Sequence, residues 1–239
     1  MVASPAQPAA DNLRRRRAPR GSGDLLRDEI LGAATQLLLE TGHAKAVSIR
    51  SVAEAVGVTP PSIYLHFHDK DALLDAVCAG YFEKLDEEMQ RVSALQSCAV
   101  DVLRAQGLAY VRFATRNPEL YRIATMGEWR SGSNVDAALA SSAFEHMCAT
   151  VRTLMEEDVF PRGDAAAVAL ELWSAAHGVA SLLIAKPHLP FGDAEAFTDR
   201  VLRALFSGNM VTGLVGADAT PEQVVQRLRA LRSSVQGSP

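Results

Sequence analysis

Residues 47–77 read VSIRSVAEAVGVTPPSIYLHFHDKDALLDAV and contain two short helical patterns separated by a tight turn. Ser48 is typical of a helix N-terminus and Gly57 of a helix C-terminus, so the first helix is expected between them. Its apolar residues fall on one stripe: Ile49, Val52, Ala53 and Val56. Thr59, with Pro60 at the first helical position, begins the second helix. A three-residue turn with glycine between two helices matches helix-turn-helix geometry, although ordinary helix corners are commoner.

The flanking sequence predicts further helices. Residues 26–38 place apolar side chains at helical spacing, and Gly42 ends that helix. After a break at His68-Asp69-Lys70, the spacing predicts a long helix over 71–95. More helices are expected near residues 100–116, 118–125, 134–159, 164–186, 194–214 and 220–234. The sequence contains no alternating β pattern and no internal repeat, so it predicts an all-α protein.

The composition is that of an ordinary globular protein, with 239 residues, 48% apolar and 22% charged. The net charge of −4 excludes a protein that binds nucleic acid through bulk charge alone. The charge is unevenly placed, because residues 1–70 carry nine Lys/Arg against seven Asp/Glu, and the remaining residues carry fifteen against twenty-one. A small module that faces anions, attached to an acidic body, is therefore expected.

The sequence lacks the signals of a secreted, membrane or metal-binding protein. The three cysteines stand far apart: Cys78, Cys98 and Cys148. We expect them to be free buried thiols in a reducing cytoplasm, and we expect no metal site and no cofactor. Residues 165–184 are the most apolar stretch, but Glu171 and His177 interrupt it, which favours a buried helix over a membrane span. The N-terminus does not resemble a signal peptide, so a cytoplasmic protein without a membrane partner is expected.

Residues 1–22 are rich in Ala, Pro, Gly and Arg and predict a flexible basic arm. Its arginines, Arg14–Arg17 and Arg20, either follow a DNA minor groove or belong to a solvated tail, and the sequence leaves both open. The expected organisation is the arm over 1–22, a helix-turn-helix domain over 23–70 and a helical body over 71–239.

Residues 27–77 resemble the tetracycline-repressor (TetR) family of transcriptional regulators. The stretches that carry the resemblance are RDEILGAATQLLLETG and the stretch quoted above. Residues 63–74 fit the family's Tyr-x-His-Phe-x-x-Lys-x-x-Leu-Leu pattern at every fixed position, and Ala-x-x-Val-Gly-Val-Thr fits the turn. The resemblance implies an N-terminal three-helix DNA-binding domain, a larger helical domain for ligand binding and dimerisation, and double-stranded operator DNA as partner.

The residue chemistry agrees with DNA binding. The Tyr64 hydroxyl can reach a phosphate, and Lys70 stands at a helix N-terminus that favours an anion. His66 can donate to a phosphate or a base edge. Ser48 and Arg50 are placed to hold the DNA backbone. The expected DNA-binding residues are Ser48, Arg50, Thr59, Pro60, Ser62, Tyr64, His66 and Lys70. By contrast, Ile63, Leu65 and Phe67 are expected to be buried.

The second helix departs from a typical base-reading helix. It begins Thr59-Pro60-Pro61-Ser62, which offers few long donors, and the two prolines remove two backbone amides. Base recognition would then depend on Thr59, Ser62, Tyr64 and apolar contacts with thymine methyl groups. The sequence therefore does not predict the operator.

In the body, residues 172–180 resemble the Trp-x-x-x-His-Gly pattern of one C-terminal domain class of these regulators. Trp173 and His177 lie four residues apart, hence on one helix face. His177 is either the polar anchor of a ligand pocket or a buried histidine with a satisfied hydrogen bond, with Gly178 as a helix-crossing point. The candidate pocket residues are Tyr110, Phe113, Tyr121, Met126, Trp129, Phe144, Met147, Trp173 and His177. Each of them could simply be a core residue.

These features favour a homodimeric repressor that a small hydrophobic ligand releases from DNA. The alternatives are a helical enzyme without a recognised catalytic motif, and a DNA-binding dimer with no ligand. The helices near 164–186 and 194–214 are the expected dimer interface. Small apolar residues there are expected to provide its contact surface: Ala169, Ala176, Ala180 and Leu183.

Overall fold

The computed structural model describes residues 23–126, 141–216 and 218–236. Within these ranges the chain is helical and contains no strand, which confirms the all-α prediction. The chain divides into two compact units, Met1–Cys78 and Ala79–Pro239. The boundary falls inside a helix, eight residues beyond the domain boundary that the sequence suggested. The arm over residues 1–22 lies outside the described residues.

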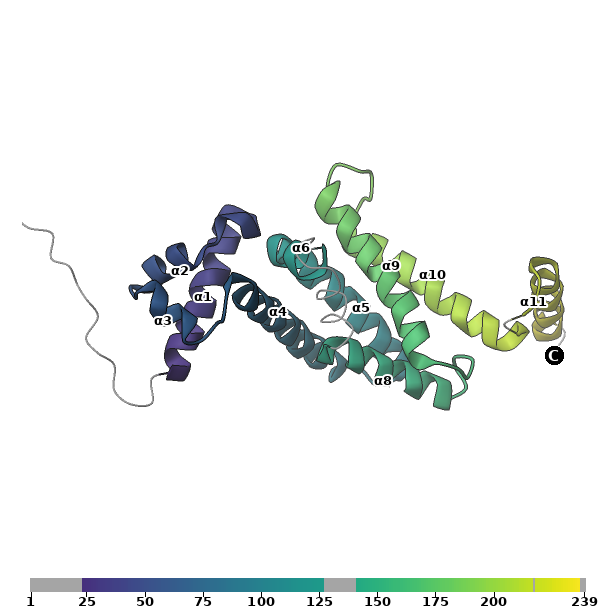
Figure 1. Ribbon diagram of the computed structural model, residues 1–239. Helices are drawn as coiled ribbons and strands as arrows, with labels where there is room; N and C mark the ends of the chain where they lie inside the picture. The colour runs from purple at the N-terminus through teal and green to yellow at the C-terminus, as the bar shows by residue number, and fades with distance from the viewer. Residues whose placement is uncertain (1–22, 127–140, 217, 237–239) are drawn as a thin grey trace, which may run out of the picture. The chain divides into compact units, whose positions relative to one another are not determined.

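The first unit contains α1 (Gly23–Thr41), a 3-10 turn (Ala44–Ala46), α2 (Ile49–Val56), α3 (Pro60–Tyr64) and the start of α4 (Lys70–Ser93) (Figure 1). Apolar side chains from all four helices, together with Phe67 between α3 and α4, form its core: Ile30, Ala34, Leu38, Val52, Ile63, Leu73 and Leu74. Ile63 and Phe67 are buried as predicted. Leu65 is 84% exposed, so the prediction that it is a core residue is wrong.

The turn between α2 and α3 forms for the reasons that the sequence suggested. Ser48 is the N-cap of α2, and its hydroxyl accepts a hydrogen bond from the backbone N–H of Ser51 at 3.0 Å. Gly57 ends α2 with φ +75°, in the left-handed region that glycine adopts at little cost. Thr59 is the N-cap residue of α3, but its hydroxyl makes a hydrogen bond with Ser62 Oγ instead of capping the backbone.

The second unit contains the rest of α4 and six further described helices. These are α5 (Ala99–Arg116), α6 (Pro118–Met126), α8 (Ser142–Glu156), α9 (Ala165–Ala185), α10 (Ala194–Val215) and α11 (Pro221–Gln236). α5 packs against α8, α9 and α10, and α9 also packs against α8 and α10 (Figure 1). These bounds lie close to the predicted ones, except that the expected helix over 134–159 is described only from Ser142.

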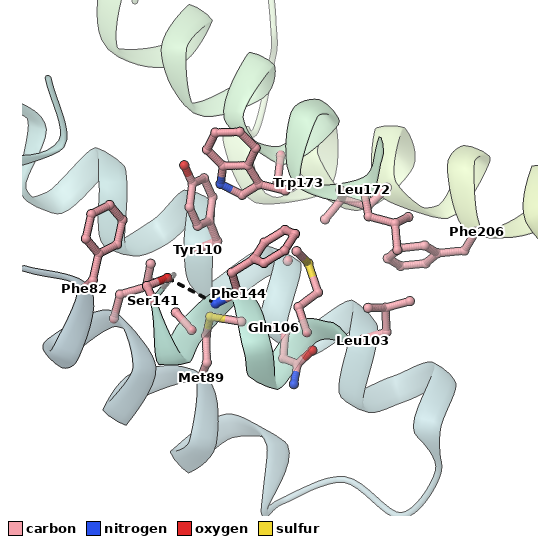
Figure 2. Close-up of a pocket in the computed structure, with 16 residues that line it drawn as sticks. Phe82, Met89, Leu103, Gln106, Tyr110, Ser141, Phe144, Leu172, Trp173 and Phe206 are labelled. Atoms are coloured by element: carbon pink, nitrogen blue, oxygen red, sulfur yellow. Dashed lines mark hydrogen bonds between the residues drawn. The ribbon is translucent and has the colours of Figure 1, made fainter. Parts of the chain in front are cut away.

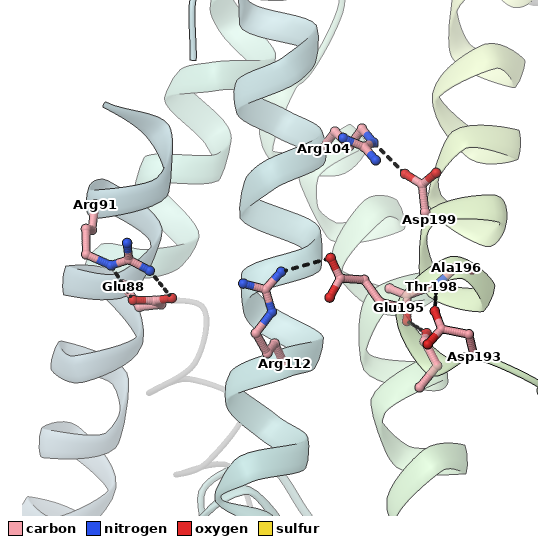
Figure 3. Close-up of polar contacts among 10 residues, drawn as sticks. Glu88, Arg91, Arg104, Arg112, Asp193, Glu195, Ala196, Thr198 and Asp199 are labelled. Carbon is pink, nitrogen blue, oxygen red and sulfur yellow. Dashed lines mark hydrogen bonds and ion pairs between the residues drawn. The ribbon is translucent and has the colours of Figure 1, made fainter. Parts of the chain in front are cut away.

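α5 and α10 pack closely together at Gly107. A Cβ atom at this position would lie 2.6 Å from Leu202 Cδ1, so only glycine fits without a shift of Leu202. A Cβ atom at Gly178 would meet no atom within 4 Å in this chain. The interpretation of Gly178 as a close crossing point between helices of the same chain is therefore wrong. Two ion pairs also join α5 to α10, Arg104 with Asp199 and Arg112 with Glu195 (Figure 3).

α9 is buried on one side only. Ala169, Ala176 and Ala180 point into the core with at most 4% exposure, so they cannot form a dimer interface as predicted. The opposite side of α9 is exposed, for example at Leu170 and Leu182. Among the described helices, α9 is the one whose length and composition would suit a membrane span. Its packing on α5, α8 and α10 is that of a helix at the edge of a protein core.

The cysteines differ in their exposure. Cys78 and Cys148 are buried, as predicted, whereas Cys98 is exposed, so that part of the prediction is wrong. Cys98 occupies the N-cap position of α5, where its thiol makes a hydrogen bond to Asp101 at 3.2 Å. All three are free thiols.

Candidate DNA-binding surface and ligand pocket

The end of α3 presents polar and apolar groups to solvent. Tyr64 is 53% exposed, and its hydroxyl has no hydrogen-bond partner among the described residues. Ser48, Arg50, Thr59 and Pro60 are exposed, and Ser62 and His66 are half-buried. The neighbouring Leu65 is the most exposed large apolar residue of this unit, and the sequence analysis did not assign it to this surface. An apolar side chain in this position can contact a thymine methyl group.

Lys70 differs from the other expected DNA-binding residues because its ammonium group already has a partner. Its Nζ donates to the Ala44 carbonyl at 2.6 Å, which ties the start of α4 to the connection between α1 and α2. The N-terminus of α4 is also occupied, because the Asp69 carboxylate accepts from the Ala72 N–H at 2.7 Å. Lys70 therefore has a structural role in this unit, whatever contact it makes with DNA.

A small apolar cavity lies inside the second unit, between α4, α5, α8, α9 and α10. Its volume is about 40 Å³. Four of the candidate pocket residues line it: Tyr110, Phe144, Met147 and Trp173 (Figure 2). Further walls come from residues that were not among the pocket candidates, for example Phe82, Leu85 and Met89 of α4. None of the lining residues carries a charge.

The other candidate pocket residues lie elsewhere. Tyr121 and His177 are adjacent to the cavity wall but do not line it, and Phe113 lines a different depression beside Arg112 and Arg116. Met126 is the last residue of α6. Trp129 lies outside the described residues.

His177 is held by two tyrosines. Its Nδ1 lies 3.2 Å from the Tyr110 hydroxyl and 2.9 Å from the Tyr121 hydroxyl, and the Tyr121 hydroxyl also contacts Ser181 Oγ at 2.9 Å. The rings of Trp173 and His177 lie 4.9 Å apart, as expected for positions i and i+4. Burial lowers the pKa of His177, which favours the neutral imidazole. This arrangement matches the histidine with a satisfied hydrogen bond and not the pocket anchor.

The polar residue that the sequence analysis missed is Gln106. It lines the cavity from α5 and is only 2% exposed. The signal was available, because Gln106 lies three residues after Leu103 and four before Tyr110, on the apolar stripe of that helix. A lone carboxamide on a buried stripe indicates a polar contact inside the core.

Comparisons with known proteins identify both units. Residues 30–77 match the model for bacterial regulatory proteins of the tetR family, and residues 103–205 match the model for a tetracyclin repressor-like C-terminal domain. The chain belongs to the TetR family. This is a family of bacterial regulatory proteins, as the resemblance implied.

Sequence relatives include the nucleoid occlusion factor SlmA of Sodalis glossinidius. It is 29% identical over 99 residues, which is 41% of this chain and 50% of that protein. For SlmA of Edwardsiella ictaluri the identity is 26% over 131 residues, or 55% of this chain and 66% of that protein. The chain thus spans about half to two thirds of the length of the curated relatives that it matches.

Solved structures share the fold. A protein with unknown function from Rhodococcus sp. RHA1 has a TM-score of 0.67 and 24% identity, covering 83% of this chain and 99% of its own. The regulator FadR of Bacillus subtilis, solved in complex with stearoyl-CoA, has a TM-score of 0.63 and 15% identity, covering 76% and 98%. At these identities the similarity shows the fold alone.

Proposed function

We propose that this regulator is a homodimeric repressor that leaves its operator when a small, mostly apolar ligand enters the cavity of the second unit. The observation that carries the proposal is where the side chains of α4 lie. Leu73, Leu74 and Val77 belong to the core of the DNA-binding unit, while Phe82, Leu85 and Met89 line the cavity. One continuous helix therefore supplies both the DNA-binding core and the cavity wall.

The size of the cavity supports a displacement on binding. Pockets for small ligands usually have a volume of about 300–1,000 Å³, against about 40 Å³ here. A ligand would therefore have to push the walls apart, and α4 is one of them. Because two recognition helices must lie about 34–36 Å apart to reach successive major grooves, a small shift of α4 weakens DNA binding.

The exposed side of α9 and α10 supports a dimer. On α9 it carries Leu170, Ser174 and Leu182, with Gly178 between them, and on α10 Leu214 is 71% exposed. Small residues at Ser174 and Gly178 allow a second helix to pack closely. We thus retain the predicted helices as the interface but assign it to their outer side chains.

The binding of DNA is tested with an operator selected from random duplexes by the purified full-length protein. Tyr64→Phe removes a phosphate contact, so the affinity is expected to fall about 5- to 10-fold, equally on all operator variants. Ser62→Ala is expected to change the preferred sequence instead. The melting temperature of Tyr64→Phe should equal that of the parent, because the hydroxyl makes no bond within the described chain. An unchanged affinity would refute the phosphate contact.

Control by a ligand is tested by reciprocity. A ligand that releases DNA must bind the operator complex more weakly than the free protein by the same factor, about 5- to 150-fold. Equal ligand affinities would favour the alternative, a DNA-binding dimer whose cavity is a packing feature. The enzyme alternative gains no support from His177, whose Nδ1 is occupied by tyrosines. Because the protein belongs to a family of bacterial regulatory proteins, we place it in the cytoplasm with the DNA.

A further inference from the structure

Gln106 makes an unequal set of hydrogen bonds inside the second unit. Its Nε2 donates to Ser93 Oγ at 3.2 Å and to Thr150 Oγ1 at 3.0 Å. Its Oε1 is buried and has no hydrogen-bond partner among the described residues. The side chain lies at the edge of the cavity, across from Tyr110 and Trp173 in the view of Figure 2.

The two hydroxyl groups fix which way the carboxamide faces. Ser93 Oγ donates its proton to the Met89 carbonyl at 2.7 Å, and Thr150 Oγ1 donates its proton to the His146 carbonyl at 3.1 Å. A hydroxyl has one proton, so while each hydroxyl donates to its helix carbonyl it accepts from Gln106. After rotation of the amide by 180°, the hydroxyls would have to give up these carbonyls to donate to Oε1, and both N–H groups of Gln106 would lose their partners. The observed orientation keeps all four of these hydrogen bonds and leaves one atom, Oε1, unpaired.

A buried acceptor without a donor is unfavourable, and a group that donates to it gains affinity. We propose that the ligand of this cavity is a neutral, mostly apolar molecule whose polar end carries a hydrogen-bond donor, a hydroxyl or an N–H, that binds Gln106 Oε1. Carboxylates and thioesters are disfavoured, because they only accept and the cavity has no charged side chain to hold an anion. This inference rests on the proposed function, since it requires that the cavity admits a ligand.

The test compares octanol with its isomer methyl heptyl ether, which has the same heavy atoms but no donor, and with octanoate. The full-length protein carries Trp129→Phe, so that of its two tryptophans only Trp173 of the cavity wall emits. Binding is measured from the Trp173 emission, and release is measured with labelled operator. In a cavity without a partner the ether would bind more tightly, because the hydroxyl loses its hydrogen bonds to water. We expect the reverse, with octanol about 5- to 30-fold tighter than the ether and octanoate weaker than both.

Gln106→Met tests the assignment to one atom. It keeps an unbranched side chain of similar size and leaves Ser93 and Thr150 bonded to their helix carbonyls, so no new unpaired donor arises. The preference for octanol over the ether is expected to disappear. The control Met147→Leu alters another residue of the cavity wall and should keep the preference, whatever its effect on absolute affinity.

The outcomes separate this inference from the proposed function. If both isomers bind equally and release the operator, the donor is refuted and the ligand-controlled repressor stands. If octanol is preferred through Gln106 but releases no DNA, the inference stands and the release mechanism is refuted. If the preference survives in Gln106→Met, the donor binds elsewhere and the inference is wrong. If none of the three probes binds up to its solubility limit, both proposals are refuted.

Discussion

At the scale of single residues, His177 shows how a polar side chain is kept neutral inside an apolar body. Its Nδ1 faces two neutral groups, the hydroxyls of Tyr110 and Tyr121, and the Tyr121 hydroxyl also contacts Ser181 Oγ. Burial lowers its pKa, and no carboxylate contacts it among the described residues to offset this effect.

The lowered pKa of His177 predicts a loss of stability in acid. Below about pH 6.5 the unfolded chain binds a proton at this residue that the folded chain does not. The free energy of unfolding therefore decreases as the pH falls below about 6.5, and the full stability is present at higher pH. Urea unfolding at about pH 7.5 and 5.5 should show a larger decrease in the wild type than in His177→Asn, in which this position does not titrate. The same decrease in both proteins would contradict the prediction.

At the scale of helices, the contact between α5 and α10 is set by one glycine and two ion pairs. The pairs are at the surface and contribute little, about 0–1 kcal/mol each. Gly107 matters more, because it lets the buried Leu202 of α10 lie against the backbone of α5. The position of α10 therefore depends on the absence of a side chain at Gly107. The same holds for the exposed side of α10, which we assign to the dimer.

Two alanine substitutions test this contact. Gly80→Ala in α4 has open space around the new Cβ and should stabilise the protein by about 0.5–1 kcal/mol, because alanine favours the helix. Gly107→Ala stabilises its helix by the same amount, but the new Cβ must displace Leu202, which is 1% exposed, at a cost of about 1–3 kcal/mol. Gly107→Ala is thus expected to be the less stable variant by that amount in urea unfolding. Equal stabilities would mean that Leu202 moves freely.

At the scale of the whole molecule, most of the exposed large apolar side chains of the second unit lie on its last three helices, α9, α10 and α11. Leu170 and Leu182 of α9, Leu214 of α10 and Leu228 and Leu231 of α11 are all more than a third exposed. We assign those of α9 and α10 to the proposed dimer, in which a second copy would cover them by two-fold symmetry.

A charge placed on this surface should separate the dimer. Ser174→Arg introduces a long cation on the exposed side of α9, next to the position of Gly178, and is expected to raise the dimer dissociation constant at least tenfold and to weaken operator binding with it. Ala149→Arg places the same side chain at an exposed position of α8 and should change neither. Sedimentation across micromolar concentrations measures the effect, and a wild type that sediments as a monomer there would end the dimer proposal.

The features that depend on local chemistry can be derived from the sequence alone. Ser48, Gly57 and Pro60 fix the ends of α2 and α3 through capping, a positive φ and a preset φ, and each of these acts within a few residues of the chain. The helices followed from apolar spacing, and the family followed from a run of fixed positions around Tyr64 and Phe67. These properties require no knowledge of which helices meet.

Which side of each helix is covered, and which polar group is left unpaired, depends on how the helices pack. The pattern of α9 could not show that Ala169 and Ala176 face the core, because nearly every side of that helix is apolar. Likewise, Lys70 finds the carbonyl of Ala44 twenty-six residues away, and Gln106 meets Ser93 and Thr150 from two other helices. Such contacts join residues distant in the chain, so they arise only when the helices pack, and it is this packing that leaves one oxygen of Gln106 without a donor.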